Sequence, residues 1–325
     1  MNISARKWLQ FAFVTCCMLL MGIQLSGCDL FQAASSQPKR TNTFTGASNP
    51  ITYSTDSHDV LIRTFYGGGL NGAFELAPQI SIYGDGTYVL GLDQQGTLSI
   101  ATLQQLLSTL VDTDGLLRLK RQQFSDIPDQ NATFLEVALN GKQVELVYGP
   151  FGHQPESATD LDEYSRLGKA IATITTTLTG PLHPYHNPSV ALLVRQIFNP
   201  DFTKTILLWD LAQFTLADAA IYECGIVPPD ETSSNAETGC LKYLIPSNAI
   251  LLAPSQLQSL QTQLNGQSEG IFTERGLYYD VTLRPLLPDE LSHKILAMFG
   301  STQGTYKAVP LLEGTTPIPT PTPTP

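Results

Sequence analysis

The chain has 325 residues, 42% of them apolar and 14% charged, a composition that excludes disorder along most of its length. Its 29 acidic and 18 basic residues give a net charge of −11, which disfavours nucleic acid and anionic lipid as direct ligands. This length is sufficient for one large hydrophobic core or two ordinary ones.

Residues 1–27 have the three parts of a bacterial export signal. Arg6 and Lys7 supply the positive start, a mostly apolar run extends from Phe11 to Ile23, and small residues follow. The apolar run is about a dozen residues long, whereas a membrane-spanning helix needs roughly 20. We therefore expect this segment to be cleaved rather than retained as a membrane helix.

Leu25-Ser26-Gly27-Cys28 resembles the lipobox of bacterial prolipoproteins. The resemblance implies that the Cys28 sulfur receives a diacylglycerol group and that a signal peptidase cuts before Cys28. Acyl chains such as palmitate would then hold the protein on the extracytoplasmic face of the cell membrane. Each buried methylene contributes about 0.8 kcal/mol, so two or three chains anchor stably. Asp29 resembles the residue that retains some Gram-negative lipoproteins in the inner membrane, and the sequence leaves the envelope type open.

Two segments outside the expected folded part lack a periodic apolar pattern. Residues 28–57 are rich in Ser, Thr, Asn and Pro, and they predict a flexible tether. Residues 313–325 end in a Thr-Pro repeat that favours polyproline II. This tail is inert, spans a cell wall or carries sugars on its threonines.

A first α+β unit is expected over residues 58–181. A strand is predicted over residues 60–66, and Gly67-Gly68-Gly69 is expected to break it. Asp85-Gly86 and Asn140-Gly141 lie between apolar-rich arms and predict tight hairpins, because such turns need positive φ. Helical spacing of apolar residues predicts helices over residues 100–111, with Thr102 and Gln105 as a candidate capping box, and over residues 160–178.

A second α+β unit is expected over residues 182–312. Residues 181–188 contain three prolines with His183 and His186, and they predict a linker into this unit. The predicted elements are strands at 190–198 and 205–208, a helix from Ser255 capped through Gln258, a hairpin around Arg275-Gly276 and a last helix over 288–299. Each unit approximates the order ββαββα, which allows an internal duplication.

Cys224 and Cys240 remain once Cys28 is assigned to lipid and Cys16 and Cys17 to the signal. An oxidising compartment and an even count favour a disulfide between the remaining two. A disulfide that closes a loop of this size stabilises the folded state by about 3 kcal/mol in the chain-entropy model. Two free thiols or a metal-binding pair are the alternatives, although no histidine is near in sequence.

A wider resemblance rests on three short motifs, which are Tyr83-Gly84-Asp85-Gly86 before a helix, Trp209-Asp210-Leu211-Ala212, and Arg284-Pro285-Leu286-Leu287-Pro288-Asp289-Glu290. Together they resemble an uncharacterised group of secreted bacterial lipoproteins, over most of residues 58–290. The group has no established activity, so the resemblance implies an exported lipoprotein and no catalytic residue.

Several motifs only partly match known ligand sites. Gly67-Gly68-Gly69 lacks the Lys and Ser or Thr of a phosphate loop, so a loop or bulge is favoured. His183 and His186 have a spacing found in metal sites, but no third ligand is nearby, so exposed histidines are favoured. Asp112-Thr113-Asp114-Gly115 begins like a calcium loop, but leucines follow, so a helix-terminating turn is favoured.

Candidate catalytic groups are equally weak. Ser57-His58-Asp59 are adjacent in sequence, and neighbours along a chain rarely form a working triad. Asp289 and Glu290 could act as acid and base, although the start of a helix explains them more simply. Four aromatic residues either line a ligand groove or pack against neighbouring strands: Tyr66, Phe74, Tyr278 and Tyr279.

These features predict a membrane-anchored extracytoplasmic lipoprotein that acts as a binding or interaction module. Its expected partners are the membrane, through the N-terminal lipid, and an unidentified envelope protein or small ligand. No nucleic acid, cofactor or metal is expected. One alternative is a cell-envelope hydrolase whose residues, His58 and His153 among them, assemble only in the fold. Another is a structural or assembly protein that uses its acidic surface.

Overall fold

The computed structural model describes residues 40–68, 74–75, 77–127, 130–211, 214–223, 243–244, 249–290, 294–299 and 306–313. Its strands form a two-stranded hairpin and two larger sheets, and helices accompany them, so the fold is α+β as predicted. The export signal, the lipidation site Cys28, the expected disulfide between Cys224 and Cys240, and the Thr-Pro tail after Glu313 lie outside the described residues.

Residues 41–54 form a hairpin rather than part of a tether. β1 (Thr41–Thr45) pairs antiparallel with β2 (Pro50–Ser54). Ile51 and Tyr53 of β2 are buried and belong to the hydrophobic cluster of the first sheet. The tether prediction is therefore wrong for this segment. The alternating apolar signal is confined to the short β2, because β1 is polar and largely exposed.

The first sheet has eight strands, which in spatial order are β11 (His183–Pro184), β7 (Gln94–Thr97), β6 (Thr87–Leu90), β5 (Ile80–Tyr83), β3 (Val60–Gly68), β9 (Asn131–Leu139), β10 (Lys142–Tyr148) and β8 (Gln123–Phe124). β8 and β10 are parallel, and the other neighbours are antiparallel. The predicted hairpins β5–β6 and β9–β10 are confirmed, with positive φ at Gly86, Asn140 and Gly141.

The glycines after residue 66 continue the strand instead of breaking it. Gly67 and Gly68 pair with Ala132 and Asn131 of β9. The predicted break therefore begins too early, because pairing with a long central neighbour outweighs the weak strand propensity of glycine.

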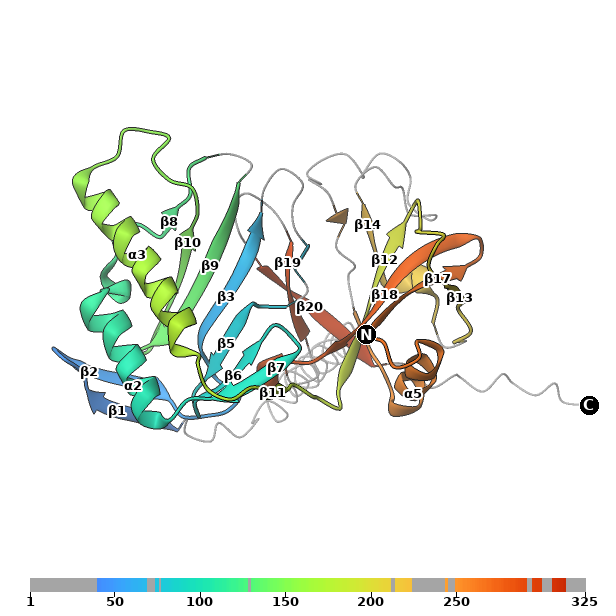
Figure 1. Ribbon diagram of the computed structural model, residues 1–325, viewed down its shortest axis with the longest axis horizontal. Coiled ribbons are helices and arrows are strands. Elements are labelled where there is room, and N and C mark those ends of the chain that lie inside the picture. Colours follow the sequence, from blue (N-terminus) through green and yellow to red (C-terminus); the bar gives the residue numbers. More distant parts are fainter. Residues whose placement is uncertain are drawn as a thin grey trace, which may run out of the picture. The chain divides into compact units, whose positions relative to one another are not determined.

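Two helices cover one face of the first sheet, α2 (Ile100–Ser108) and α3 (Ala158–Thr177), and they lie side by side in Figure 1. A π-turn η1 (Thr109–Thr113) and a 3₁₀ turn η2 (Leu116–Arg118) follow α2. Both predicted helices are confirmed. The side chain of Ser99 caps α2 by accepting from Thr102 N, so the expected Thr102–Gln105 box is wrong. Six helix residues enter the core on this face: Leu103, Leu106, Leu107, Leu167, Ala170 and Ile174.

The second sheet has ten strands, which in spatial order are β13 (Ile206–Leu208), β17 (Glu269–Glu274), β18 (Leu277–Pro285), β12 (Val190–Ile197), β16 (Ala249–Leu251), β20 (Tyr306–Glu313), β19 (Lys294–Phe299) and β4 (Phe74–Glu75), with β14 (Ala220–Glu223) beside β12 and β15 (Tyr243–Leu244) beside β14. The short helix α4 (Leu216–Ala219) precedes β14. The predicted hairpin around Arg275-Gly276 is confirmed as β17–β18.

α5 (Pro254–Gln263) packs through Leu260 into the hydrophobic cluster of the second sheet, with Leu192, Phe272 and Val281. The helix begins one residue before the predicted Ser255. The expected pairing of Ser255 with Gln258 is wrong, because Ala253 N donates to Gln256 Oε1 at 2.8 Å.

The predicted last helix over residues 288–299 is wrong. Residues Pro288–Glu290 form only a 3₁₀ turn, η3, and residues Lys294–Phe299 form strand β19. β19 pairs antiparallel with β20 and with β4, which is distant in sequence. This non-local pairing outweighs the helix propensity of Leu, Ala and Met in this stretch.

The segment predicted as a linker is also built into the fold. β11 adds to the edge of the first sheet, and Tyr185 is buried, with its hydroxyl donating to Leu286 O at 2.5 Å. Residues Thr41–Pro325 group into one compact unit that contains two large hydrophobic clusters, one for each sheet. The boundary between residues 181 and 182 stays a prediction.

Candidate functional site

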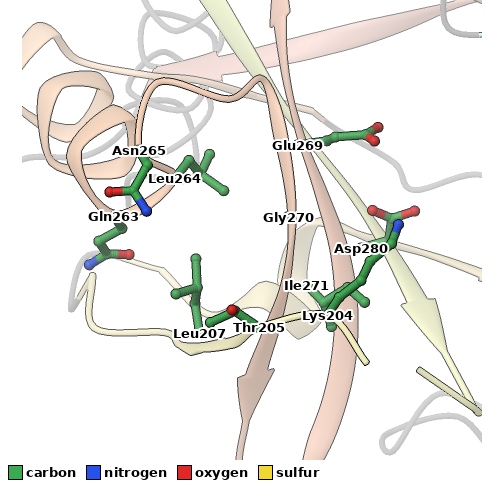
Figure 2. Close-up of a pocket in the computed structure, with 10 residues that line it drawn as sticks. All are labelled: Lys204, Thr205, Leu207, Gln263, Leu264, Asn265, Glu269, Gly270, Ile271 and Asp280. Carbon is green, nitrogen blue, oxygen red and sulfur yellow. The ribbon is translucent and has the colours of Figure 1, made fainter. Parts of the chain in front are cut away.

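A pocket of about 220 Å³ opens at the edge of the second sheet, near the end of α5 (Figure 2). Its lining residues come from β13 and the turn before it, from the end of α5 and the residues just after it, and from β17 and β18: Lys204, Thr205, Leu207, Gln263, Leu264, Asn265, Glu269, Gly270, Ile271 and Asp280. Sites for drug-sized ligands occupy roughly 300–1,000 Å³. This pocket is smaller, so its size suits a single side chain or a small organic group.

The pocket exists because β13 begins late along β17. Ile206 is aligned with Ile271, so Glu269 and Gly270 extend past the start of β13. Gly270 preserves the space, since a Cβ built there would lie 2.4 Å from Leu264 Cδ2. A larger residue at position 270 would displace Leu264 or fill the hollow.

The charged groups that line the pocket are two carboxylates, Glu269 and Asp280, and one ammonium group, Lys204. Glu269 is an exposed carboxylate, and the carboxylate of Asp280 already accepts from Arg195 Nη2 at 2.7 Å. Gln263 Nε2 donates to Asp210 at 2.6 Å, while Gln263 Oε1 is buried and has no partner among the described residues. A buried acceptor is costly until a donor reaches it. Because Gln263 Oε1 is closed to solvent, the exposed carboxylate of Glu269 is the acceptor that an ammonium or guanidinium group can reach.

A tight turn before β13 presents an aromatic side chain beside the pocket. Lys204 N donates to Asp201 O at 3.0 Å, and Asp201 Oδ1 accepts from the backbone N and Oγ1 of Thr203. These hydrogen bonds from Thr203 lower the pKa of Asp201, so the turn is held by an ionised carboxylate at neutral pH. Phe202 lies at the tip of the turn, and 71% of it is exposed.

Three large apolar residues between the end of β12 and the end of β13 are the most exposed large apolar residues in the described part of the chain. Phe198 is 69% exposed, Phe202 71% and Leu208 72%, and we refer to them as the apolar rim. Phe202 packs edge-on against Tyr278 with ring centroids 5.9 Å apart. Exposed apolar groups gathered at one place mark interaction surfaces more often than scattered ones do.

A second hollow of about 260 Å³ is lined by both apolar and polar residues, and the polar ones include Asp93, His186, Asn187 and Gln267. Its polar groups are partly engaged already. Asp93 O accepts from Tyr185 N, and Asn187 Nδ2 donates to Leu286 O at 2.8 Å. Neither hollow is lined by a residue of the apolar rim, but Lys204 and Leu207 of the smaller pocket lie within two residues of Phe202 and Leu208 in the chain, so the smaller pocket is the stronger candidate.

Ser57-His58-Asp59 does not form a triad. Ser57 Oγ and Asp56 Oδ1 both contact the same nitrogen, Nδ1 of His58, at 3.3 and 3.0 Å. A triad needs the two ring nitrogens to serve different partners. Asp59 instead accepts from the hydroxyl of Ser54 at 2.5 Å.

Asp289 and Glu290 are held in ion pairs. Asp289 Oδ1 accepts from Arg63 Nη2 at 2.7 Å and from the Tyr83 hydroxyl at 3.0 Å. Glu290 accepts from both terminal nitrogens of Arg284, at 2.6 and 2.8 Å. Neither carboxylate therefore has the setting of a general acid or base, and their role at a helix start is wrong because no helix follows.

His183 and His186 are exposed, as expected, and His183 belongs to β11. His153 is exposed too, and its backbone N–H is bound to Asp126 at 3.1 Å. Across the described residues, no group of three or more His, Cys, Asp or Glu side chains is arranged to hold a metal ion.

The Asp112-Thr113-Asp114-Gly115 motif ends a helix, as predicted, with Gly115 in the left-handed region at φ 65°. Asp112 Oδ2 accepts from the Ser108 hydroxyl. Asp114 is buried, and this burial raises the pKa of its carboxyl despite the nearby positive charges of Lys169 and Arg166.

Of the aromatic residues considered as candidates for a ligand groove, some pack in the core and others are exposed. Tyr279 is buried in the second hydrophobic cluster, and Tyr278 is half-buried against Phe202. Tyr66 is 42% exposed and lies outside the pocket, and the side chain of Phe74 lies outside the described residues. The apolar rim was not predicted from the sequence. Its available signal was two phenylalanines flanking the turn-forming Asn199-Pro200-Asp201.

Comparison of the chain with protein-family models, with curated proteins and with solved structures found no match. Over the part that the structure describes, no helix is both long enough and apolar enough to cross a bilayer.

Proposed function

We propose that the protein is a membrane-anchored extracytoplasmic lipoprotein that acts as an interaction module and binds an envelope polypeptide at the pocket and the apolar rim. The main support is the exposure of Phe198, Phe202 and Leu208 between β12 and the end of β13, together with a pocket beside β13 that the carboxylates of Glu269 and Asp280 line. The pocket is too small for most complete cofactors, yet the surface around it offers further apolar contact.

The anchor is supported by the lipobox resemblance of Leu25-Ser26-Gly27-Cys28 after an export signal. Labelling of producing cells with tritiated palmitate tests it. The wild-type protein and Cys16→Ser, whose change lies in the expected signal, should incorporate label and fractionate with membranes. Cys28→Ser should do neither, and an unlabelled wild-type protein would contradict the proposal.

The binding surface is tested by site-specific photo-cross-linking in the native envelope. A benzophenone amino acid at position 202 should yield a discrete adduct with one partner. The same group at Leu161, which is 50% exposed on α3, is the matched control and should not yield that adduct. The purified partner should bind the purified protein and lose affinity for Phe202→Ser. Equal adducts from both positions would argue against a specific surface at the apolar rim.

The internal duplication also remains our proposal. Its support is a shared order of helix then hairpin, since β9–β10 follows α2 and β17–β18 follows α5. The two halves differ afterwards, because α3 follows the first hairpin and strands β19 and β20 follow the second.

A further inference from the structure

The outer edge of β13 offers backbone hydrogen-bonding groups. β13 lies at the end of the second sheet, and no other described strand pairs with its outer side. Trp209 N donates to Thr273 O at 3.1 Å, and Leu207 is aligned with Phe272 of β17. In a parallel ladder, alternate residues bond to the same neighbour. The backbone groups of Ile206 and Leu208 therefore point away from β17.

Two members of the apolar rim, Leu208 and Phe202, lie along one row across this end of the sheet. The strand registers align Leu208 with Thr273, Thr273 with Tyr278, and Tyr278 with Ile197. Aligned residues share a face of the sheet. Phe202 packs on Tyr278, so it extends the same row. An open strand edge and an exposed apolar row therefore occur together.

An extended polypeptide is the occupant that satisfies both features. A strand supplies backbone donors and acceptors at the edge, and its alternate side chains reach the apolar row. A small ligand fills the pocket but leaves the edge unpaired.

The local charge favours a basic segment over a second copy of this chain. Four carboxylates surround the edge and the pocket, with two cations among them: Asp201, Asp210, Glu269 and Asp280 against Arg195 and Lys204. The whole chain carries a net charge of −11, so two copies repel each other, as do the chain and an anionic lipid surface.

We propose that an extended, basic segment of an envelope polypeptide adds as a strand to the outer edge of β13 and places a Lys or Arg side chain in the pocket. This inference rests on the proposed interaction module and specifies the partner's chemistry and conformation. The partner's apolar side chains cover Leu208 and Phe202, and its basic side chain reaches the carboxylate of Glu269.

The first test uses the full mature protein in detergent and a labelled peptide of alternating valine and lysine. Fluorescence anisotropy should detect binding. The same peptide with N-methyl groups on alternate residues loses the strand-forming N–H donors, and it should bind roughly tenfold more weakly or worse. A valine–glutamate peptide should not bind detectably.

Matched protein variants separate backbone from side-chain contacts. Leu208→Pro removes an outward N–H and spares the bonds to β17, whereas Leu208→Ser retains that N–H. Leu208→Pro should lower the affinity for the parent peptide roughly tenfold more than Leu208→Ser does. The two variants should bind the N-methylated peptide with equal affinity. Unchanged Trp209 fluorescence and far-UV circular dichroism would show that both variants are folded.

The outcomes distinguish the two proposals. If the methylated and parent peptides bind equally, strand addition is wrong. If the Phe202 adduct still forms in that case, the interaction surface stands. A parent peptide that does not bind would overturn the basic, extended partner. A concentration-dependent dimer abolished by Leu208→Pro would assign the edge to a second copy and would also overturn the inference.

Discussion

A buried ion pair joins the end of β18 to the turn that follows it. Arg284 and Glu290 form a bidentate pair whose side chains are 0% and 1% exposed. Leu287 N also donates to Glu290 Oε2 at 2.7 Å. The carboxylate therefore both pairs with Arg284 and stabilises the turn after β18. A buried pair of this kind gives modest net stability while intact, but losing one partner is costly because the other charge stays buried.

Glu290→Ala should therefore lower the free energy of unfolding by about 3–5 kcal/mol. Urea denaturation of the purified protein measures this change. Asp162→Ala is the matched control, because Asp162 is 67% exposed in its pair with Arg166 and should contribute at most about 1 kcal/mol. The double variant Arg284→Met/Glu290→Leu should recover much of the loss. Equal effects of the two single variants would contradict the argument.

Asp126 makes a second residue-scale prediction, on pH dependence. Partial burial opposes ionisation of this carboxyl, but N–H donors of His153, Gln154 and Gly152 outweigh it and lower the pKa of Asp126. A carboxyl with a lowered folded-state pKa stabilises the fold above its unfolded pKa. That contribution is lost as pH falls through the lowered value.

Asp126→Asn should consequently be less stable than wild type at neutral pH. The difference should shrink as pH is lowered from about 6 to about 3, a window that includes the unfolded pKa of aspartate. Urea titrations across this window measure the difference, and amide hydrogen exchange should be faster at residues 152–154 in the variant at neutral pH. A difference that is constant with pH would show that the charge of Asp126 has no role.

At the scale of elements, tight turns position the strands of both sheets. The β9–β10 turn has positive φ at Asn140 and Gly141, at 54° and 67°. This turn is also hydrogen-bonded to the β1–β2 hairpin. Asn140 N donates to Thr52 O at 2.8 Å, and Thr52 N donates to Asn140 Oδ1 at 2.7 Å. Asn140 thus adopts the left-handed backbone conformation that the turn requires and also accepts a side-chain hydrogen bond from β2.

Two substitutions of Asn140 separate these contributions. Both Asn140→Gly and Asn140→Ala lose the side-chain acceptor for Thr52 N. Only alanine adds the strain of the left-handed region, roughly 1–2 kcal/mol. Asn140→Ala should therefore unfold at a lower urea concentration than Asn140→Gly. The reverse order would indicate that the backbone leaves the left-handed region in the variants.

The hairpins were predictable because Asp-Gly, Asn-Gly and Arg-Gly pairs specify their turns locally. β1 and β19 were not, for different reasons. β1 is a polar strand recruited by β2, and β19 contains helix-forming residues that are committed to a strand only by β20 and β4. The secondary-structure propensity of a segment does not reveal a partner strand that is distant along the chain.

The candidate site was less predictable than the fold. The pocket depends on the offset between β13 and β17, and on the absence of a side chain at Gly270 next to Leu264. The offset depends on how the two strands pair, so the sequence of either strand alone does not predict it. Phe198 and Phe202 were visible in the sequence, but their exposure follows from the turn at Asp201.

At the scale of the whole molecule, buried polar contacts link the two sheets. The first sheet contributes Arg63 and Tyr83, which both bind Asp289 on η3, after the second sheet's β18. Arg63 is 3% exposed, and Asp289 is 16% exposed. Burial and the adjacent Asp289 carboxylate raise the pKa of Tyr83, so its hydroxyl remains a donor at neutral pH. These contacts explain how two hydrophobic clusters belong to one compact unit.

Asp289→Ala should uncouple the unfolding of the two clusters. Trp209 reports on the second cluster through its contacts with Phe272, and the only other tryptophan, Trp8, is in the expected signal. In the mature wild-type protein, Trp209 fluorescence and far-UV circular dichroism should give coincident urea transitions. In Asp289→Ala the two transitions should separate, because Arg63 loses its carboxylate at a cost of about 3–5 kcal/mol. Asp162→Ala, which removes an exposed pair, should keep them coincident. Coincident transitions in Asp289→Ala would show that apolar contacts alone couple the sheets.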